Sequence, residues 1–126
     1  MSLHDKILEV YQSVKSYPDL VQKLIELGIQ SYTVDVATGS ILYRLADGEN
    51  LLHVGEVDNR SIFERFSADL TVMAIRDNQQ GKTTYPEFMH AIGAAGVRFY
   101  EATLTGENKR VTYIGFGGFY EESIPI

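Results

Sequence analysis

The sequence contains no cysteine, no tryptophan and only three prolines among its 126 residues. Without cysteine the chain can form no disulfide, use no thiolate nucleophile and offer no thiolate to a metal. It also lacks an apolar run close to the roughly 20 residues that a membrane-spanning helix needs. These absences exclude thiol chemistry, and we expect no membrane partner.

A surplus of basic charge is missing as well. Lys and Arg number 11 against 17 Asp and Glu, which gives a formal net charge of -6. Such a chain repels a phosphate backbone unless its basic residues gather on one face, and the longest basic cluster is the pair Lys109-Arg110. We therefore expect no nucleic acid partner. The first residues show no secretory signal, so we expect a cytoplasmic protein.

What is present is the composition of an ordinary globular protein. Hydrophobic residues make up 44% of the chain and charged residues 22%, far from the profile of a disordered segment. The length is that of one typical domain. We expect residues 1–126 to form a single domain.

The chain carries an internal duplication. Tyr17-Pro18-Asp19-Leu20 returns 68 residues later as Tyr85-Pro86-Glu87-Phe88, and Gly28 and Gly96 keep the same spacing. After one longer turn the spacing becomes 70, which pairs Tyr43 with Tyr113. We assign the repeats to about 3–57 and 58–126.

Each repeat predicts two helices followed by strands. Proline suits the first turn of a helix, and glycine suits the left-handed residue that ends one, so a short helix lies between Pro18 and Gly28 and between Pro86 and Gly96. Alternating apolar residues then indicate hairpin strands, with short third strands near 51–54 and 119–122. The predicted fold class is α+β: two tandem helix-helix-strand-strand repeats that form one antiparallel sheet with the helices on one face.

A longer helix is predicted to open each repeat. Leu3, Ile7, Val10 and Val14 form an apolar stripe in the first. In the second, Ser61 and Glu64 fit a capping box for a helix from about Arg60 to Asn78. Its apolar stripe is predicted to consist of Phe63, Phe66, Leu70 and Met73.

Tyrosines occupy equivalent positions in the two repeats. Core packing with the hydroxyl at a polar rim is the simpler interpretation, and a pocket ringed by phenols between sheet and helices is the functional one. His90, which stands where the first repeat has Gln22, and the titratable Glu101 are added to the tyrosines as candidate ligand-binding residues. The candidates are Tyr17, Tyr43, Tyr85, His90, Glu101 and Tyr113.

The outer face of the predicted sheet mixes apolar and charged side chains. A solvent-facing sheet seldom carries several large apolar residues together. We expect this face to form a homodimer contact or to bind a protein partner through Leu42, Arg44, Phe99 and Ile114.

No motif predicts a cofactor or a metal. Gln80-Gly81-Lys82-Thr83 ends like a phosphate-binding loop, but Arg76 stands where the first glycine is required. The three histidines are far apart and match no metal-ligand spacing. No nucleophile elbow is present, so acyl transfer has no support.

The C-terminal stretch from Gln79 to Pro125 carries a family resemblance. It includes Gln80-Gly81, Ala95-Gly96-Val97, Val111-Thr112-Tyr113 and the ending Glu122-Ser123-Ile124-Pro125. This pattern resembles a family of small uncharacterised bacterial proteins, some of them prophage-encoded and labelled phage envelope protein. The resemblance implies a stand-alone cytosolic domain and transfers no catalytic residue.

Three functional hypotheses follow. The leading one is a non-enzymatic protein that binds a partner or a small molecule. The second is a small enzyme whose cleft lies at the junction of the repeats, with His90, Glu101, Tyr85 and Tyr113 as its polar residues. The third is a virion-associated protein.

Overall fold

The computed structural model describes residues 2–14, 16–55 and 59–124. In the first repeat, helices α1 and α2 precede strands β1, β2 and β3; in the second, α3 and α4 precede β4, β5 and β6. The first repeat consists of α1 Leu3–Ser13, α2 Tyr17–Glu26, β1 Ile29–Asp35, β2 Ile41–Leu45 and β3 Asn50–His53. The second consists of α3 Ala68–Gln79, α4 Tyr85–Ala94, β4 Val97–Thr103, β5 Arg110–Gly115 and β6 Gly118–Ser123.

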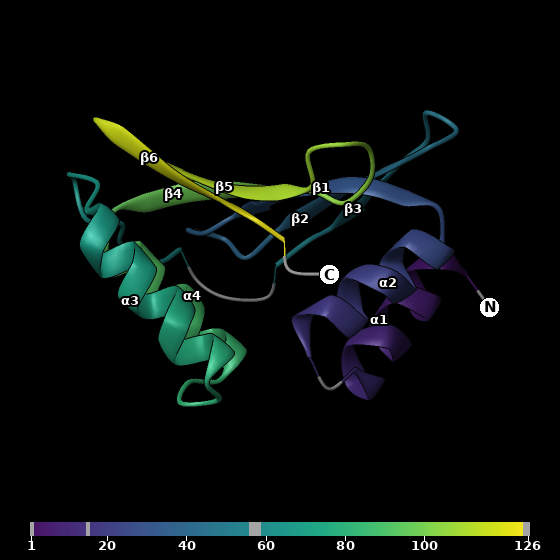
Figure 1. Ribbon diagram of the computed structural model, residues 1–126, viewed down its shortest axis with the longest axis horizontal. Coiled ribbons are helices and arrows are strands. Elements are labelled where there is room, and N and C mark those ends of the chain that lie inside the picture. Colours follow the sequence, from purple (N-terminus) through teal and green to yellow (C-terminus); the bar gives the residue numbers. More distant parts are fainter. Residues whose placement is uncertain (1, 15, 56–58, 125–126) are drawn as a thin grey trace.

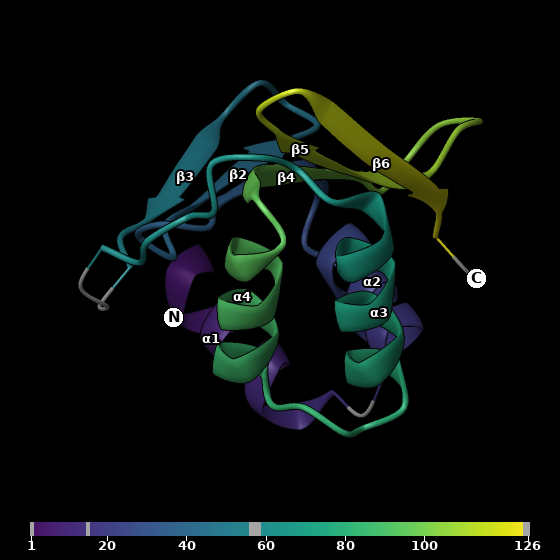
Figure 2. The same ribbon diagram turned by 90° about the vertical axis from the view of Figure 1, so that its left-hand side faces the viewer.

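The strands form one antiparallel sheet in the order β3-β2-β1-β4-β5-β6. All four helices lie on one face of this sheet, as two separate pairs (Figures 1 and 2). The α1–α2 pair lies beneath one half of the sheet and the α3–α4 pair beneath the other (Figure 1). The predicted α+β fold with duplicated units is therefore confirmed. None of the helices in the described ranges is long and apolar enough to cross a membrane.

The two repeats meet at the β1–β4 pair. Thr33 lies opposite Glu101 at the centre of this pair, and Tyr32 lies opposite Ala102 just as Val34 lies opposite Tyr100. A residue of β1 and the residue 68 positions later on β4 therefore occupy equivalent places on the two strands. The approximate two-fold axis of the molecule passes between Thr33 and Glu101, and the two helix pairs flank it.

Equivalent signals start and stop the second helix of each repeat. Ser16 caps α2 and Thr84 caps α4, and each hydroxyl accepts a hydrogen bond from a backbone amide in the first turn. Thr84 forms a capping box with Glu87. Gly28 and Gly96 follow the helix ends with φ of +90° and +87°, as the duplication predicted.

The predicted helix from Arg60 to Asn78 is wrong in its first third. Helix α3 begins at Ala68, after the cap Ser67. The segment before it is tied to other elements, because Phe63 donates its backbone N–H to Gly93 at 2.9 Å and Phe66 donates its own to Phe116 at 3.1 Å. Amides engaged in this way cannot bond to a preceding turn of helix.

The predicted apolar stripe of α3 is wrong as well. Phe63, Leu70 and Met73 are each at least half exposed. The helix instead buries Thr71, Ala74 and Ile75. The bulky Phe66 lies over Gly115 and Gly118, where a side chain would collide with its ring.

The core lies between the sheet and the helices. Inward residues of the strands alternate with outward ones, and the buried apolar residues of both repeats form one continuous cluster. The core includes Ile7, Leu24, Tyr32, Val34, Tyr43, Met89, Ile92, Tyr100, Ala102 and Tyr113, each at most 6% exposed.

The equivalent glycines Gly28 and Gly96 allow a matched test of the packing. Gly28→Ala should lower the free energy of unfolding by roughly 1–2 kcal/mol, because alanine is strained at positive φ while no atom lies within 4 Å of the new methyl group. Gly96→Ala should cost a further ~1–3 kcal/mol, because its methyl group would lie 2.4 Å from the Arg65 carbonyl oxygen. Urea denaturation of both variants measures the difference. Equal losses would contradict the close approach of the 59–67 segment to Gly96.

Candidate functional site

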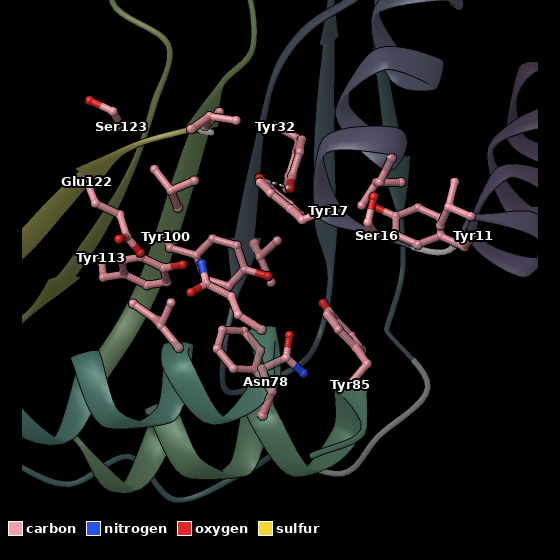
Figure 3. Close-up of a pocket in the computed structure, with 18 residues that line it drawn as sticks. Tyr11, Ser16, Tyr17, Tyr32, Asn78, Tyr85, Tyr100, Tyr113, Glu122 and Ser123 are labelled. Carbon is pink, nitrogen blue, oxygen red and sulfur yellow. Dashed lines mark hydrogen bonds between the residues drawn. The ribbon is translucent and has the colours of Figure 1, made fainter. Parts of the chain in front are cut away.

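A cavity of about 260 Å³ lies under the sheet, between the two helix pairs. Its volume lies just below the roughly 300–1,000 Å³ of small-molecule sites. Residues from both repeats and from the end of β6 line it (Figure 3). The wall combines six tyrosines (Tyr11, Tyr17, Tyr32, Tyr85, Tyr100 and Tyr113) with the apolar Val14, Leu20, Val34, Ile75, Phe88, Val111 and Ile124.

All eight tyrosines of the chain lie in or directly behind this wall. The two that do not line the cavity contact tyrosines that do. Tyr43 donates a hydrogen bond to the Tyr11 hydroxyl at 3.1 Å, and the Tyr120 ring stacks on that of Tyr113 with centroids 6.4 Å apart. The cavity is therefore enclosed largely by phenol side chains, which offer an apolar ring and a polar hydroxyl together.

In the first repeat the phenols satisfy one another. The Tyr17 and Tyr32 hydroxyls share a hydrogen bond of 2.9 Å, and Tyr43 is paired with Tyr11. Tyr17 stands at the start of α2 and Tyr32 in the middle of β1, so the pair joins helix to sheet. These four hydroxyls stabilise the wall itself.

In the second repeat the equivalent phenols are covered less completely. The hydroxyls of Tyr85 and Tyr100 interact with each other, which shifts the pKa of both in addition to the larger effect of burial. Within the described residues, the Tyr113 hydroxyl has no hydrogen-bond partner, and its oxygen is not sealed from solvent-sized space. Figure 3 shows Tyr100 and Tyr113 on the sheet side and Tyr85 on the helix side of the same space. Three hydrogen-bonding groups therefore face the cavity.

The difference between the repeats comes from one pair of positions. Tyr11 lies on α1, and 68 residues later Gln79 ends α3; both line the cavity. Tyr11 reaches the Tyr43 hydroxyl, whereas the Gln79 side chain accepts a hydrogen bond from Arg76 at 3.0 Å. Gln79 thus leaves the Tyr113 hydroxyl uncovered.

An ion pair closes the cavity beside Tyr113. Glu122 of β6 binds the Arg76 guanidinium of α3 through both carboxylate oxygens, at 2.8 and 3.3 Å. Because side chains alternate along β6, Glu121 points outward to Arg110 and Glu122 points inward.

Asn78 and Ser16 complete the polar part of the wall near the helix ends. The Asn78 amide nitrogen donates to the Thr83 carbonyl at 3.2 Å, and its side chain lies beside the cavity in Figure 3. The Ser16 hydroxyl accepts a hydrogen bond from the Asp19 amide as the cap of α2. Within the described ranges, the Asn78 side-chain oxygen and the Ser16 hydroxyl hydrogen each have no protein partner.

Burial keeps the phenols protonated. Loss of solvent raises the pKa of Tyr17 to about 12 against the opposing hydrogen bond from Tyr32, and raises the pKa of Tyr43 to about 12 against that from Tyr11. The pKa values of Tyr32, Tyr100 and Tyr113 are also raised, chiefly by burial. At neutral pH the cavity therefore presents uncharged O–H groups.

The structure brings together only some of the residues predicted as a ligand site. Tyr17, Tyr85 and Tyr113 line the cavity, and Tyr43 lies one hydrogen bond behind it. His90 is exposed on α4 and is not part of the wall. Glu101 lies on the opposite face of the sheet.

Sequence reasoning missed several residues of the wall. Tyr32 and Tyr100 keep the 68-residue spacing of the repeats, and the alternation of inward and outward residues in their strands is the signal that could have placed them beneath the sheet. Tyr11 has no tyrosine counterpart in the second repeat, so the duplication could not identify it. Asn78 and Glu122 come near the cavity only through the packing of α3 against β6.

The outer face of the sheet holds the residues predicted as an interface. Arg44 donates to Thr33 at 2.7 Å and pairs with Glu101 at 3.3 Å. Farther along the sheet, Phe99 lies opposite Ile114, and Ile114 lies opposite Phe119. Phe99 is 38% exposed and Phe119 68%. These three residues, here called the outer apolar row, cross β4, β5 and β6.

Potential metal ligands do not gather in the described residues. No group of three or more His, Asp or Glu side chains there could hold an ion. The nearest arrangement is a pair, in which His4 of α1 and His53 of β3 share a hydrogen bond of 2.9 Å. Within the described part of the chain, the cavity is therefore the best candidate for a functional site.

Comparison with known proteins adds a family. A family model described as protein of unknown function (DUF1398) matches residues 5–118, which cover most of both repeats. No curated protein matches the sequence significantly.

The buried tyrosines make the fold sensitive to alkali. Below pH 10, the ordinary pKa of tyrosine, the folded and unfolded chains hold the same phenol protons. Above it the unfolded chain releases protons that the folded protein keeps. For Tyr32, Tyr43, Tyr100 and Tyr113 together, the free energy of unfolding should therefore fall as pH rises, by up to ~1.4 kcal/mol per pH unit for each.

Circular dichroism and the ultraviolet absorbance of phenolate, followed together through an alkaline titration, measure this effect. We expect most phenolate to appear only as the fold is lost, above pH 10. Phenolate formation by most tyrosines near pH 10 in a still folded protein would contradict the burial of these side chains.

Proposed function

The chain belongs to the DUF1398 family, whose function is unknown, and from its cavity we propose that it is a small-ligand-binding protein. The ligand would occupy the tyrosine-lined space between the helix pairs. Apolar clefts with a few convergent polar groups are the usual sites of small molecules.

The observation that carries this proposal is the unpaired hydroxyl of Tyr113 in a space that Tyr85 and Tyr100 also face. These three tyrosines come from three different elements. Within the described residues, no protein group accepts the Tyr113 proton, whereas the hydroxyl of its counterpart Tyr43 is bonded to Tyr11. A ligand that accepts a hydrogen bond from Tyr113 would gain a contact that the first repeat makes within the protein.

The cavity supports binding better than catalysis. Its one carboxylate, Glu122, is occupied by Arg76, and its phenols keep their protons. The titratable residues proposed for an enzyme, His90 and Glu101, lie away from it. Nothing in the geometry of the described residues favours the virion-associated role, and the cytoplasmic location stays a prediction from the sequence.

Two equivalent tyrosines provide the test of ligand binding. Tyr113→Phe removes a hydroxyl that faces the cavity, while Tyr43→Phe removes its counterpart, which faces only Tyr11. A small-molecule fragment library screened by NMR against the wild-type protein should identify ligands that shift cavity resonances. For a carbonyl-bearing hit, Tyr113→Phe should weaken binding about five- to tenfold, and Tyr43→Phe should change it less than about twofold.

Thermal unfolding of each variant controls for stability. Each lost hydroxyl should change the free energy of unfolding by no more than ~1.5 kcal/mol. If no fragment shifts resonances of the cavity, or if both variants weaken binding equally, the proposed site is wrong.

We also propose that the protein forms a homodimer through the outer face of its sheet. Phe99 and Phe119 of the outer apolar row are exposed there, and Ile114 between them is half-buried. The charges around it are locally balanced, since Arg44 pairs with Glu101 and Arg110 with Glu121. Two copies that each carry a net charge of -6 can therefore meet at this face without strong repulsion.

Light scattering coupled to size exclusion measures the oligomeric state. We expect a dimer for the wild-type chain and a monomer for Phe119→Asp, which places a charge in the outer apolar row. Phe63→Asp is the matched control, because Phe63 is 58% exposed but precedes α3 and lies outside the sheet. A wild-type monomer at high concentration, or a dimer that survives Phe119→Asp, would exclude this interface.

A further inference from the structure

The one carboxylate in the described wall of the cavity is paired within the protein. Apart from the protonated tyrosines, Glu122 is the only ionisable residue among the described residues of the wall. Both of its oxygens bind the Arg76 guanidinium. The described wall therefore offers neither an unpaired cation nor an unpaired anion to a ligand.

A charged ligand would be poorly accommodated in such a space. Burial of an ion without a partner is costly, because the surroundings do not replace its hydration. An anion would also approach a protein of net charge -6. A cation that approached Glu122 would meet the positive charge of Arg76 at the same carboxylate. An uncharged molecule meets none of these penalties.

The two ends of the cavity differ in polarity. At the second-repeat end, Tyr100 and Tyr113 lie on adjacent strands with ring centroids 5.2 Å apart, and the Tyr113 hydroxyl has no partner among the described residues. At the first-repeat end, the phenols of Tyr17 and Tyr32 are bonded to each other. Apolar side chains from both helix pairs, including Leu20 and Phe88, line the rest of the wall. A planar apolar body with an acceptor at one end fits this gradient.

Resting on the proposed function, we infer that the cavity selects small, uncharged aromatic molecules that carry a carbonyl or amide group. The carbonyl oxygen accepts a hydrogen bond from the hydroxyl of Tyr113, and the ring packs among the apolar residues. Gln79 determines this specificity, because it leaves uncovered the end of the cavity that Tyr11 closes in the first repeat.

Three probes with one phenyl ring and different head groups test the charge selection. Benzamide is neutral, benzoate is an anion and benzamidinium is a cation of similar shape; benzene has the ring alone. In NMR titrations at neutral pH we expect benzamide to shift cavity resonances and to bind at least about tenfold more tightly than either ion or benzene.

The outcomes separate the two claims. If benzoate or benzamidinium binds in the cavity as tightly as benzamide, the selection for uncharged ligands is wrong and the binding function stands. If benzene equals benzamide, the recognition of a carbonyl group is wrong. If none of the four probes shifts cavity resonances and the fragment library also gives no ligand there, the proposed function itself fails.

Gln79→Tyr tests the specificity determinant. The new phenol would stand where Tyr11 stands in the first repeat and would cover Tyr113, so benzamide affinity should fall at least about tenfold. Gln80→Tyr is the matched control, because Gln80 is the exposed neighbour that does not line the cavity. An unchanged affinity in Gln79→Tyr, or equal losses in both folded variants, would overturn the role of Gln79.

Discussion

The pairing of β1 with β4 is the constraint on which the remainder of the molecule depends. Because these strands are antiparallel and centred on Thr33 and Glu101, the two repeats share one sheet and are related by an approximate two-fold axis. That axis puts both helix pairs on the same face, one beneath each half of the sheet (Figure 1), and the cavity is lined by residues of both pairs. Tyr32 and Tyr100, one from each central strand, form the roof of that space. The cavity is thus a direct consequence of how the halves are joined.

Departures from the symmetry give the cavity its chemistry. A fully symmetric pair of repeats would cover both lobes with the same side chains, and each phenol would have the same partner. The replacement of Tyr11 by Gln79 at the equivalent place frees the hydroxyl of Tyr113, and the Arg76–Glu122 pair closes the wall next to it. In the first repeat the phenol hydroxyls are hydrogen-bonded to one another, whereas in the described part of the second repeat the Tyr113 hydroxyl has no partner. Divergence after duplication commonly acts in this way, through residues whose partners change while the backbone does not.

Much of the fold could be predicted because its signals are local. Proline and a cap at each helix start, glycine at each helix end, and alternating residues in each strand act over a few residues, and the duplication presents each signal twice. The start of α3 could not be predicted in this way. Ser61 and Glu64 satisfy a capping pattern, but tertiary hydrogen bonds from Phe63 and Phe66 hold that segment in another conformation. Helix propensity amounts to only a few tenths of a kcal/mol per residue, so such tertiary contacts override it.

The sequence by itself determined the duplicated α+β architecture, the equivalence of the paired tyrosines and the mixed character of the outer sheet face, since all three follow from periodicity and spacing. Only the tertiary structure decided which tyrosines surround a cavity, because burial and hydrogen-bond partners depend on residues far apart in the chain. It separated Tyr113 from Tyr43, which the spacing treats as equal, and it set Glu101 and His90 apart from the phenols. The physical reason is that helices and strands follow from signals between residues close together in the chain. A site forms where side chains from several distant elements meet.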